Sequence, residues 1–93
     1  MTQKYPAVHP DDFMKFGGEK PSHLRIEEDL ISIAGSGPAG NEFKKDVLKL
    51  AGWTGSALTT YASRAQVAAD AFNKINAILV ETSDPDAIKS ALS

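Results

Sequence analysis

Hydrophobic positions in the second half of this 93-residue chain recur at helical spacing. Intervals of three and four residues alternate along the longest apolar stripe, which is typical of one face of an α-helix. A shorter stripe with the same kind of spacing precedes it. We therefore expect an all-α fold dominated by helix between residues 41 and 82. The long stripe comprises Leu58, Tyr61, Ala65, Ala68, Phe72, Ile75 and Leu79, and the shorter one begins with Phe43, Val47 and Leu50.

Gly52 and Gly55 lie between the two stripes and leave two interpretations open. The segment is either one long helix kinked at these glycines or a helical hairpin joined at residues 51–55. A straight helix over residues 41–80 would be about 60 Å long, too long for a monomer of this size to cover. We expect the helix to fold back on itself or to bury its seam against another copy of the chain, in a homo-oligomer.

Prolines, glycines and capping residues predict three shorter helices. Pro10 at a first helical position and the pair Gly17-Gly18 bound a short helix over residues 10–16, whose first turn holds Asp11 and Asp12. These positions suit a helix N-terminus better than a catalytic carboxylate pair. With one domain over residues 1–93, we expect an N-terminal ligand-binding part (1–40), the long helix or hairpin (41–82) and a C-terminal helix (83–93).

Ser22 is the expected N-cap of the second short helix, which Gly35 ends after Ala34. Leu24, Leu30, Ile31 and Ala34 are expected to share its buried face. The last helix runs from Pro85 to Leu92 and follows Ser83-Asp84.

The motif Gly35-Ser36-Gly37-Pro38-Ala39-Gly40 resembles the dinucleotide fingerprint of flavoproteins. That fingerprint requires a preceding strand, which residues 30–34 would have to supply, and an acidic residue about twenty positions later. Residues 55–62 contain no acid, and a helical pattern follows them. We therefore expect an interhelical loop in which Pro38 or Asn41 opens the next helix, with nucleotide-dependent redox chemistry as a distant alternative.

Composition narrows the function further. The chain has no cysteine, ten basic and twelve acidic residues, and a formal charge of −2. It can therefore form neither disulfides nor zinc–thiolate sites, and it has no overall basic field for DNA. No apolar run is long enough to cross a membrane. The two histidines lack metal-ligand spacing, and no catalytic motif is present, so we expect no enzyme activity, no metal and no cofactor.

The N-terminal third gathers groups suited to a flat, anionic ligand. Tyr5 could stack on a base, the Lys20 ammonium could meet a phosphate, and Ser22 at a helix N-terminus could bind the remaining oxygens. His9 lies between them in the sequence. The alternative is that the phenylalanines here are core residues and that Tyr5 and Lys20 are ordinary surface residues.

The segments YPAVHPDDF (residues 5–13) and EKPSHL (residues 19–24), followed by a helical hairpin, resemble the small phage anti-CBASS proteins. Members of that family sequester cyclic nucleotides. The resemblance covers the length, the order of elements and the spacing of fifteen residues between Tyr5 and Lys20.

The resemblance implies a homo-hexameric sponge that binds cyclic dinucleotides between protomers without degrading them, in the cytoplasm of an infected bacterium. Tyr5 would stack on a base and Lys20 would contact a phosphate. The family also binds cyclic trinucleotides in a second pocket, for which Arg64 is the candidate residue. The competing hypothesis is a small helical interaction or virion-structural protein that binds no small molecule.

Overall fold

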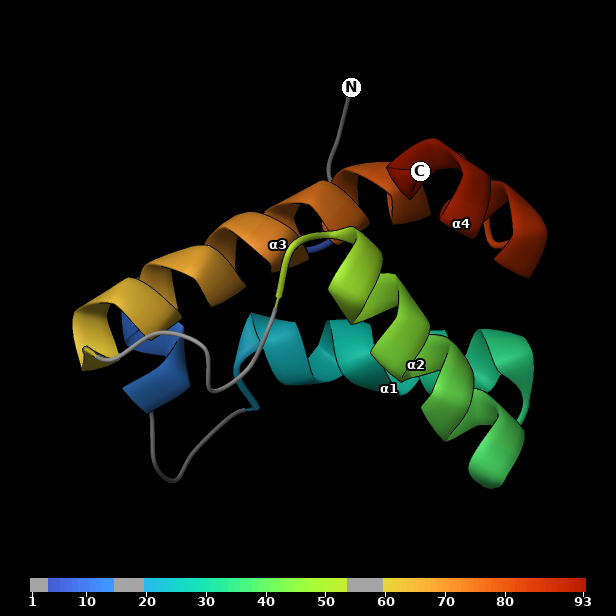
Figure 1. The fold of residues 1–93 in the computed structure, drawn as a ribbon, viewed down its shortest axis with the longest axis horizontal. Helices are drawn as coiled ribbons and strands as arrows, with labels where there is room; N and C mark the ends of the chain where they lie inside the picture. The colour runs from blue at the N-terminus through green and yellow to red at the C-terminus, as the bar shows by residue number, and fades with distance from the viewer. Residues whose placement is uncertain (1–3, 15–19, 54–59) are drawn as a thin grey trace.

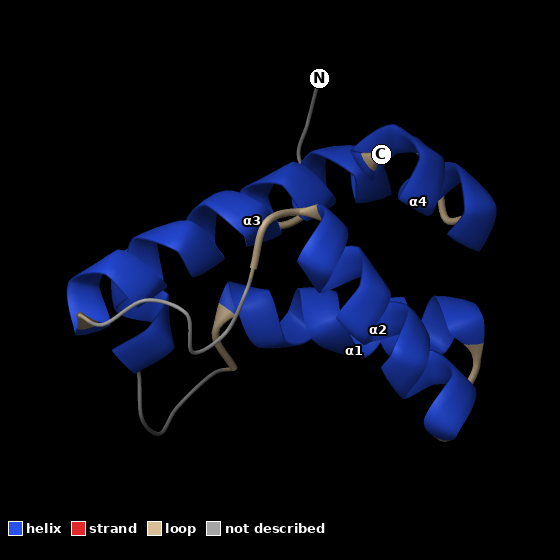
Figure 2. Cartoon of the chain, in the orientation of Figure 1, coloured by secondary structure: helices blue, strands red, loops and turns tan. Residues whose placement is uncertain are grey.

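Prolines, glycines and side-chain caps separate the helices of this protein. The computed structural model describes residues 4–14, 20–53 and 60–93, and these ranges contain helices and no β-strand (Figures 1 and 2). The all-α prediction is confirmed. In chain order the elements are the 3₁₀ helix η1 (Pro10–Met14), α1 (Ser22–Ala34), α2 (Pro38–Leu50), α3 (Tyr61–Glu81) and α4 (Pro85–Leu92).

The predicted end of α1 and both predicted bounds of α4 are confirmed. α1 ends where Gly35 takes a φ of 96°, a backbone conformation that glycine adopts without steric cost. At the start of α4, the Asp84 carboxylate accepts a hydrogen bond of 3.0 Å from the backbone N–H of Ala87, and Pro85 takes the first helical position. These local signals act within one helical turn, which is why the sequence alone locates them.

The first predicted helix is shorter than expected. It is a 3₁₀ helix that ends at Met14, and the predicted remainder and its Gly17-Gly18 stop fall in residues 15–19, outside the described residues. Ser22 is not the N-cap of α1 as predicted. Pro21 takes that position, with extended backbone (φ −59°, ψ 153°), and Ser22 is the first residue of the helix.

α2 and α3 are two separate helices rather than one long helix, and the predicted joint at residues 51–55 lies partly in residues 54–59, outside the described residues. α2 begins at Pro38, one of the two predicted starts, and α3 begins at Tyr61. The longest dimension of the protein is 33 Å, so a helix of about 60 Å has no place in it. Figure 1 shows α3 along one side, with η1 at its first end and α4 beside its last turns.

The core lies between α3 and the other helices. The predicted stripe on α3 is buried from Ala65 onwards, while Leu58 and the side chain of Tyr61 lie outside the description. The apolar face of α3 is thus covered by other parts of the same chain. This face therefore does not need a second copy of the chain to bury it. The buried core residues are Val8, Ile26, Leu30, Phe43, Val47, Leu48, Ala51, Ala68, Ala69, Ala71, Phe72, Ile75, Leu79 and Ile88.

Two predicted core positions are wrong. Leu24 is 39% exposed and Leu50 is 42% exposed, whereas their neighbours Ile26 and Leu48 are buried. In both helices, the neighbour and the predicted leucine lie two positions apart, on different sides of the helix. The tertiary partners select the buried side.

The glycine-rich motif is a helix–helix contact. Residues 30–34, which a dinucleotide fold would need as a strand, are the last residues of α1. Gly35 and Gly37 make the turn with positive φ, and Gly40 lies against the end of α1. A Cβ at Gly40 would lie 2.0 Å from the carbonyl oxygen of Gly35. The glycines therefore allow the backbones of α1 and α2 to approach closely.

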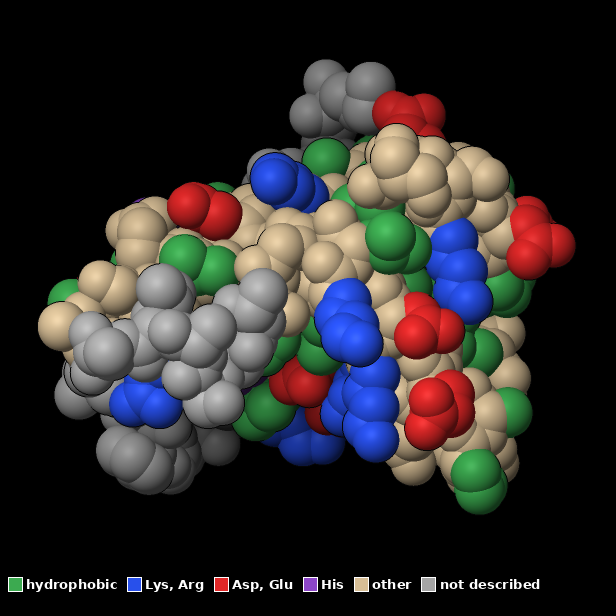
Figure 3. Space-filling model, in the orientation of Figure 1, with side chains coloured by type: hydrophobic (Ala, Val, Ile, Leu, Met, Phe, Trp, Pro, Cys, Tyr) green, Lys and Arg blue, Asp and Glu red, His purple; other side chains and the backbone are tan. Residues whose placement is uncertain are grey.

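Charged residues on the outer faces are mixed in sign. Figure 3 shows lysine and acidic side chains interleaved on one face of the molecule. Several are ion pairs between helices: Lys44 with Glu27 and Lys89 with Asp46, each at 3.4 Å.

Candidate functional site

A pocket of about 300 Å³ lies beside η1 and the first turn of α1. It brings together three of the five predicted site residues, which are His9, Lys20 and Ser22. Its wall on one side is formed by the segment that precedes η1. The lining residues are Pro6, Ala7, His9, Asp12, Lys20, Pro21, Ser22 and Arg25.

The start of η1 fixes His9 at the pocket. The backbone N–H of His9 donates to the Asp12 carboxylate at 3.1 Å, and the N–H of Asp12 donates to the His9 carbonyl at 2.9 Å. This reciprocal pair closes the turn around Pro10. Asp12 is 8% exposed, so its carboxylate serves the backbone here, as expected for an acid at a helix N-terminus.

The first turn of α1 supplies Ser22 and Arg25. Because they are three residues apart on a helix, their side chains lie on the same face, and both reach the pocket. The N–H groups of Leu24 and Arg25 donate to the carbonyl of Pro21 at 3.1 and 3.4 Å. Since Pro21 and Ser22, at the N-terminus of α1, line the pocket, the positive end of the helix dipole adds to the charge of the Arg25 guanidinium there.

Lys20 contributes a second cation. Its ammonium lies 2.8 Å from a carboxylate oxygen of Glu28, and the two side chains are 63% and 55% exposed. Ion pairs as exposed as this one contribute about 0–1 kcal/mol. A phosphate entering the pocket could therefore take the Lys20 ammonium from Glu28 at little cost.

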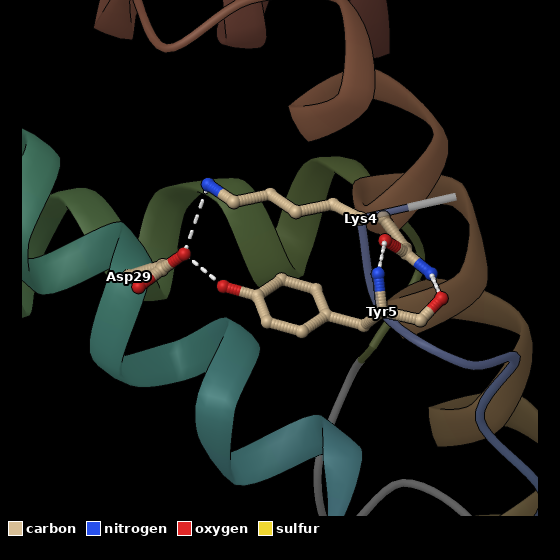
Figure 4. A network of polar contacts seen from close by, with 4 residues as sticks. Lys4, Tyr5 and Asp29 are labelled. Carbon is tan, nitrogen blue, oxygen red and sulfur yellow. Dashed lines mark hydrogen bonds and ion pairs between the residues drawn. The ribbon is translucent and has the colours of Figure 1, made fainter. Parts of the chain in front are cut away.

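Tyr5 and Arg64 do not line this pocket. The Tyr5 hydroxyl donates to the Asp29 carboxylate of α1, and the Lys4 ammonium lies 3.0 Å from the same carboxylate oxygen (Figure 4). Arg64 is exposed in the first turn of α3, where its backbone N–H donates to Thr60. The predicted base-stacking role of Tyr5 and the second pocket at Arg64 stay predictions.

The other histidine, His23, lies on the inner side of α1. It is 8% exposed, and its ring centroid is 5.5 Å from that of Phe72 on α3. Burial disfavours the imidazolium and lowers the pKa of His23 below its ordinary value of 6.5, against the weaker opposing effect of Glu27 and Asp12. The fold therefore favours the neutral form of this histidine.

Stability is expected to fall when the pH is lowered through the titration of His23. The unfolded chain, with the higher pKa, binds the proton more readily, so the contribution of His23 is complete above about pH 6.5 and decreases below it. We expect a smaller loss of unfolding free energy between pH 7.5 and 5.5 in His23→Gln than in the wild type. Urea titrations at both pH values measure it. An equal loss in His23→Gln and in the wild type would contradict the assignment.

No metal cluster is found in the described ranges: no three histidine, aspartate or glutamate residues come close enough together to hold an ion. None of the helices in those ranges is both long and apolar enough to cross a bilayer.

Comparison with known protein families, with curated proteins and with solved structures gives no match.

Sequence reasoning missed Arg25 and two asparagines of α3: the side chains of Asn73 and Asn76 hydrogen-bond to the backbone of Val8 and Tyr5, in the segment beside the pocket. The spacing of Arg25 from Ser22 was a usable signal, since residues at i and i+3 share a helical face. Asn76 follows Phe72 by four residues, so the sequence places an amide on the apolar face of α3. A polar residue at such a position needs buried hydrogen-bond partners. The sequence therefore indicates that Asn76 forms such hydrogen bonds, but it does not identify the partner residue.

Proposed function

We propose that this protein binds cyclic dinucleotides and sequesters them without cleaving them. The observation that carries the proposal is the convergence of Lys20, Arg25, Ser22 and His9 on one pocket. Two cations, a hydroxyl and an imidazole are groups that bind phosphate oxygens. The pocket's acidic side chain, Asp12, is engaged by the backbone of His9.

The charge arrangement suits a phosphodiester. Arg25 offers a planar set of donors to phosphate oxygens, and Lys20 offers a point charge that can leave its exposed partner Glu28. The dipole of α1 points its positive end at the same place. We propose that binding, without cleavage of the ligand, is the whole of the protein's task at this pocket.

The pocket's volume favours sharing the ligand between two copies of the chain. About 300 Å³ is at the lower end of the range for small-molecule pockets. A cyclic dinucleotide has two bases and two phosphates in near two-fold symmetry, so half of it could occupy each pocket of an isologous dimer. A homo-hexamer, as in the phage anti-CBASS family, would be built from such pairs. The biological setting we propose is the cytoplasm of an infected bacterium, where removal of the signal blocks CBASS defence.

Isothermal titration calorimetry with cyclic di-AMP and cyclic di-GMP tests the proposal. We expect the wild type to bind at least one of them, and Lys20→Ala and Arg25→Ala each to bind about tenfold more weakly or worse, because each removes a charged hydrogen bond to phosphate. Lys45→Ala is the matched control: this exposed lysine pairs with Glu42 on α2 and should be dispensable. Heating the complex should release intact ligand.

Three results would count against the proposal. Absence of binding by the wild type would favour the helical interaction or virion-structural protein. Equal binding by all variants would move the site away from this pocket. Recovery of a linear dinucleotide after heating would indicate a hydrolase. A cyclic trinucleotide titrated against the wild type and Arg64→Ala tests the second proposed pocket in the same way.

A further inference from the structure

The segment that forms the pocket wall, residues 4–9, is fastened to α3 by two side-chain amides; we call it the N-terminal strap. Asn73 accepts a hydrogen bond from the N–H of Val8 at 2.6 Å and donates to the Val8 carbonyl at 3.0 Å. Asn76 does the same for Tyr5, at 3.3 and 2.9 Å. Each carboxamide thus pairs with the two polar groups of one backbone residue, as a neighbouring β-strand would.

The strap is also anchored by burial and by α1. Val8 is 2% exposed and Asn76 is fully buried, so one partner in each pair of hydrogen bonds is shielded from water. At the outer end, Tyr5 and Lys4 both contact Asp29 of α1 (Figure 4). The strap therefore bridges α3 and α1 across the edge of the pocket.

The clamped residues bracket the pocket wall. Pro6 and Ala7 line the pocket and lie between the clamped Tyr5 and Val8, and His9 follows directly. Asn73 and Asn76 lie one turn apart on α3, and their hydrogen bonds determine where Val8 and Tyr5 lie. The packing of α3 against η1 and α1 then sets the distance between this wall and the cations Lys20 and Arg25.

We infer that Asn73 and Asn76 are positioning residues of the ligand site, and that ligand binding and strap docking stabilise each other. The inference rests on the proposed binding of a cyclic dinucleotide. A ligand that needs the wall binds the docked state, so its apparent affinity falls with the fraction of chains in that state. By linkage, the same ligand must shift the strap towards the docked state.

Amide hydrogen exchange at Tyr5 and Val8, followed by NMR, tests the coupling without any substitution. Their N–H groups donate to the two asparagines, so they exchange when the strap opens. At a cyclic di-AMP or cyclic di-GMP concentration of about 100 Kd, exchange at both amides should slow by up to about 100-fold. Local opening of the strap does not expose the N–H of Ile88 on α4, which bonds to Asp84. Slowing by the same factor at Ile88 would instead indicate global stabilisation and overturn the coupling.

Asn73→Ala tests the positioning role, with Lys74→Ala, an exposed neighbour on α3, as the control. In Asn73→Ala we expect exchange at Val8 to be about tenfold faster and ligand binding at least about fivefold weaker. Lys74→Ala should stay within about twofold in both measurements.

The outcomes separate this inference from the proposed function. If the wild type binds a cyclic dinucleotide and Asn73→Ala binds it equally well despite faster exchange at Val8, the inference is overturned and the proposed function stands. If the wild type binds neither cyclic dinucleotide, the proposed function falls and the coupling with it.

Discussion

Gly40→Ala is expected to lower the free energy of unfolding by about 3 kcal/mol or more. The added Cβ would lie 2.0 Å from the carbonyl oxygen of Gly35 and 3.1 Å from both the carbonyl oxygen and a methyl carbon of Ile31. Overpacking against flexible side chains costs about 1–3 kcal/mol, and here the nearest obstacle is backbone. The ends of α1 and α2 would have to separate.

Thermal and urea unfolding followed by circular dichroism measure this effect, which corresponds to a decrease in Tm of about 12 °C or more in a domain of this size. Ala39→Ser is the matched control, since it adds one atom at the exposed neighbouring position and should stay within about 0.5 kcal/mol of the wild type. A Gly40→Ala protein as stable as the wild type would mean that α1 and α2 do not meet at Gly40.

Asn76→Leu should cost about 2–4 kcal/mol of unfolding free energy. Leucine has a similar size, so the change leaves the buried volume filled, but the N–H and carbonyl of Tyr5 lose their hydrogen bonds to a side chain that is fully buried. Each unsatisfied buried polar group costs about 1–3 kcal/mol. If the strap detached from α3, the backbone N–H and carbonyl of Tyr5 would form hydrogen bonds with water, and the loss of unfolding free energy would be smaller.

Asn76→Asp keeps the shape of the side chain and removes only its hydrogen-bond donor. At neutral pH the introduced carboxylate would face the Tyr5 carbonyl with no proton to donate, and burial would raise its pKa. Lowering the pH protonates it and restores a donor, so part of the lost stability should return relative to Asn76→Leu. Urea titrations of both variants at two pH values provide the comparison. The same pH dependence in both variants would show that the Asn76 amide does not hold Tyr5.

Helix bounds were accessible from the sequence because local chemistry sets them. Gly35 ends α1 by its own backbone conformation, and Asp84 caps α4 through a bond within the same turn. Neither signal depends on a distant residue. The buried faces of α1 and α2 were harder to predict from the sequence, because apolar residues lie on more than one side of each helix. Only the packing of the helices decides that Ile26 is buried and Leu24 exposed, and that Leu48 is buried and Leu50 exposed.

The candidate site was partly accessible. Lys20 and Ser22 are close in the sequence, and the short turn at Pro10 brings His9 to them, so local reasoning collected these three. The Tyr5–Asn76 and Val8–Asn73 contacts join residues 71 and 65 positions apart. No local pattern predicts such pairs, and they are what turns Tyr5 towards α1 and Asp29.

This separation along the chain has a consequence for how the protein is made. During synthesis Lys20, Ser22 and Arg25 leave the ribosome long before Asn73 and Asn76. Closing a loop of about 65 residues is entropically costly and slow compared with forming a local helical hairpin such as α1–α2. The pocket wall is therefore completed late in folding, and a nascent chain that ends before α3 would carry the cations of the pocket without the helix that holds its wall.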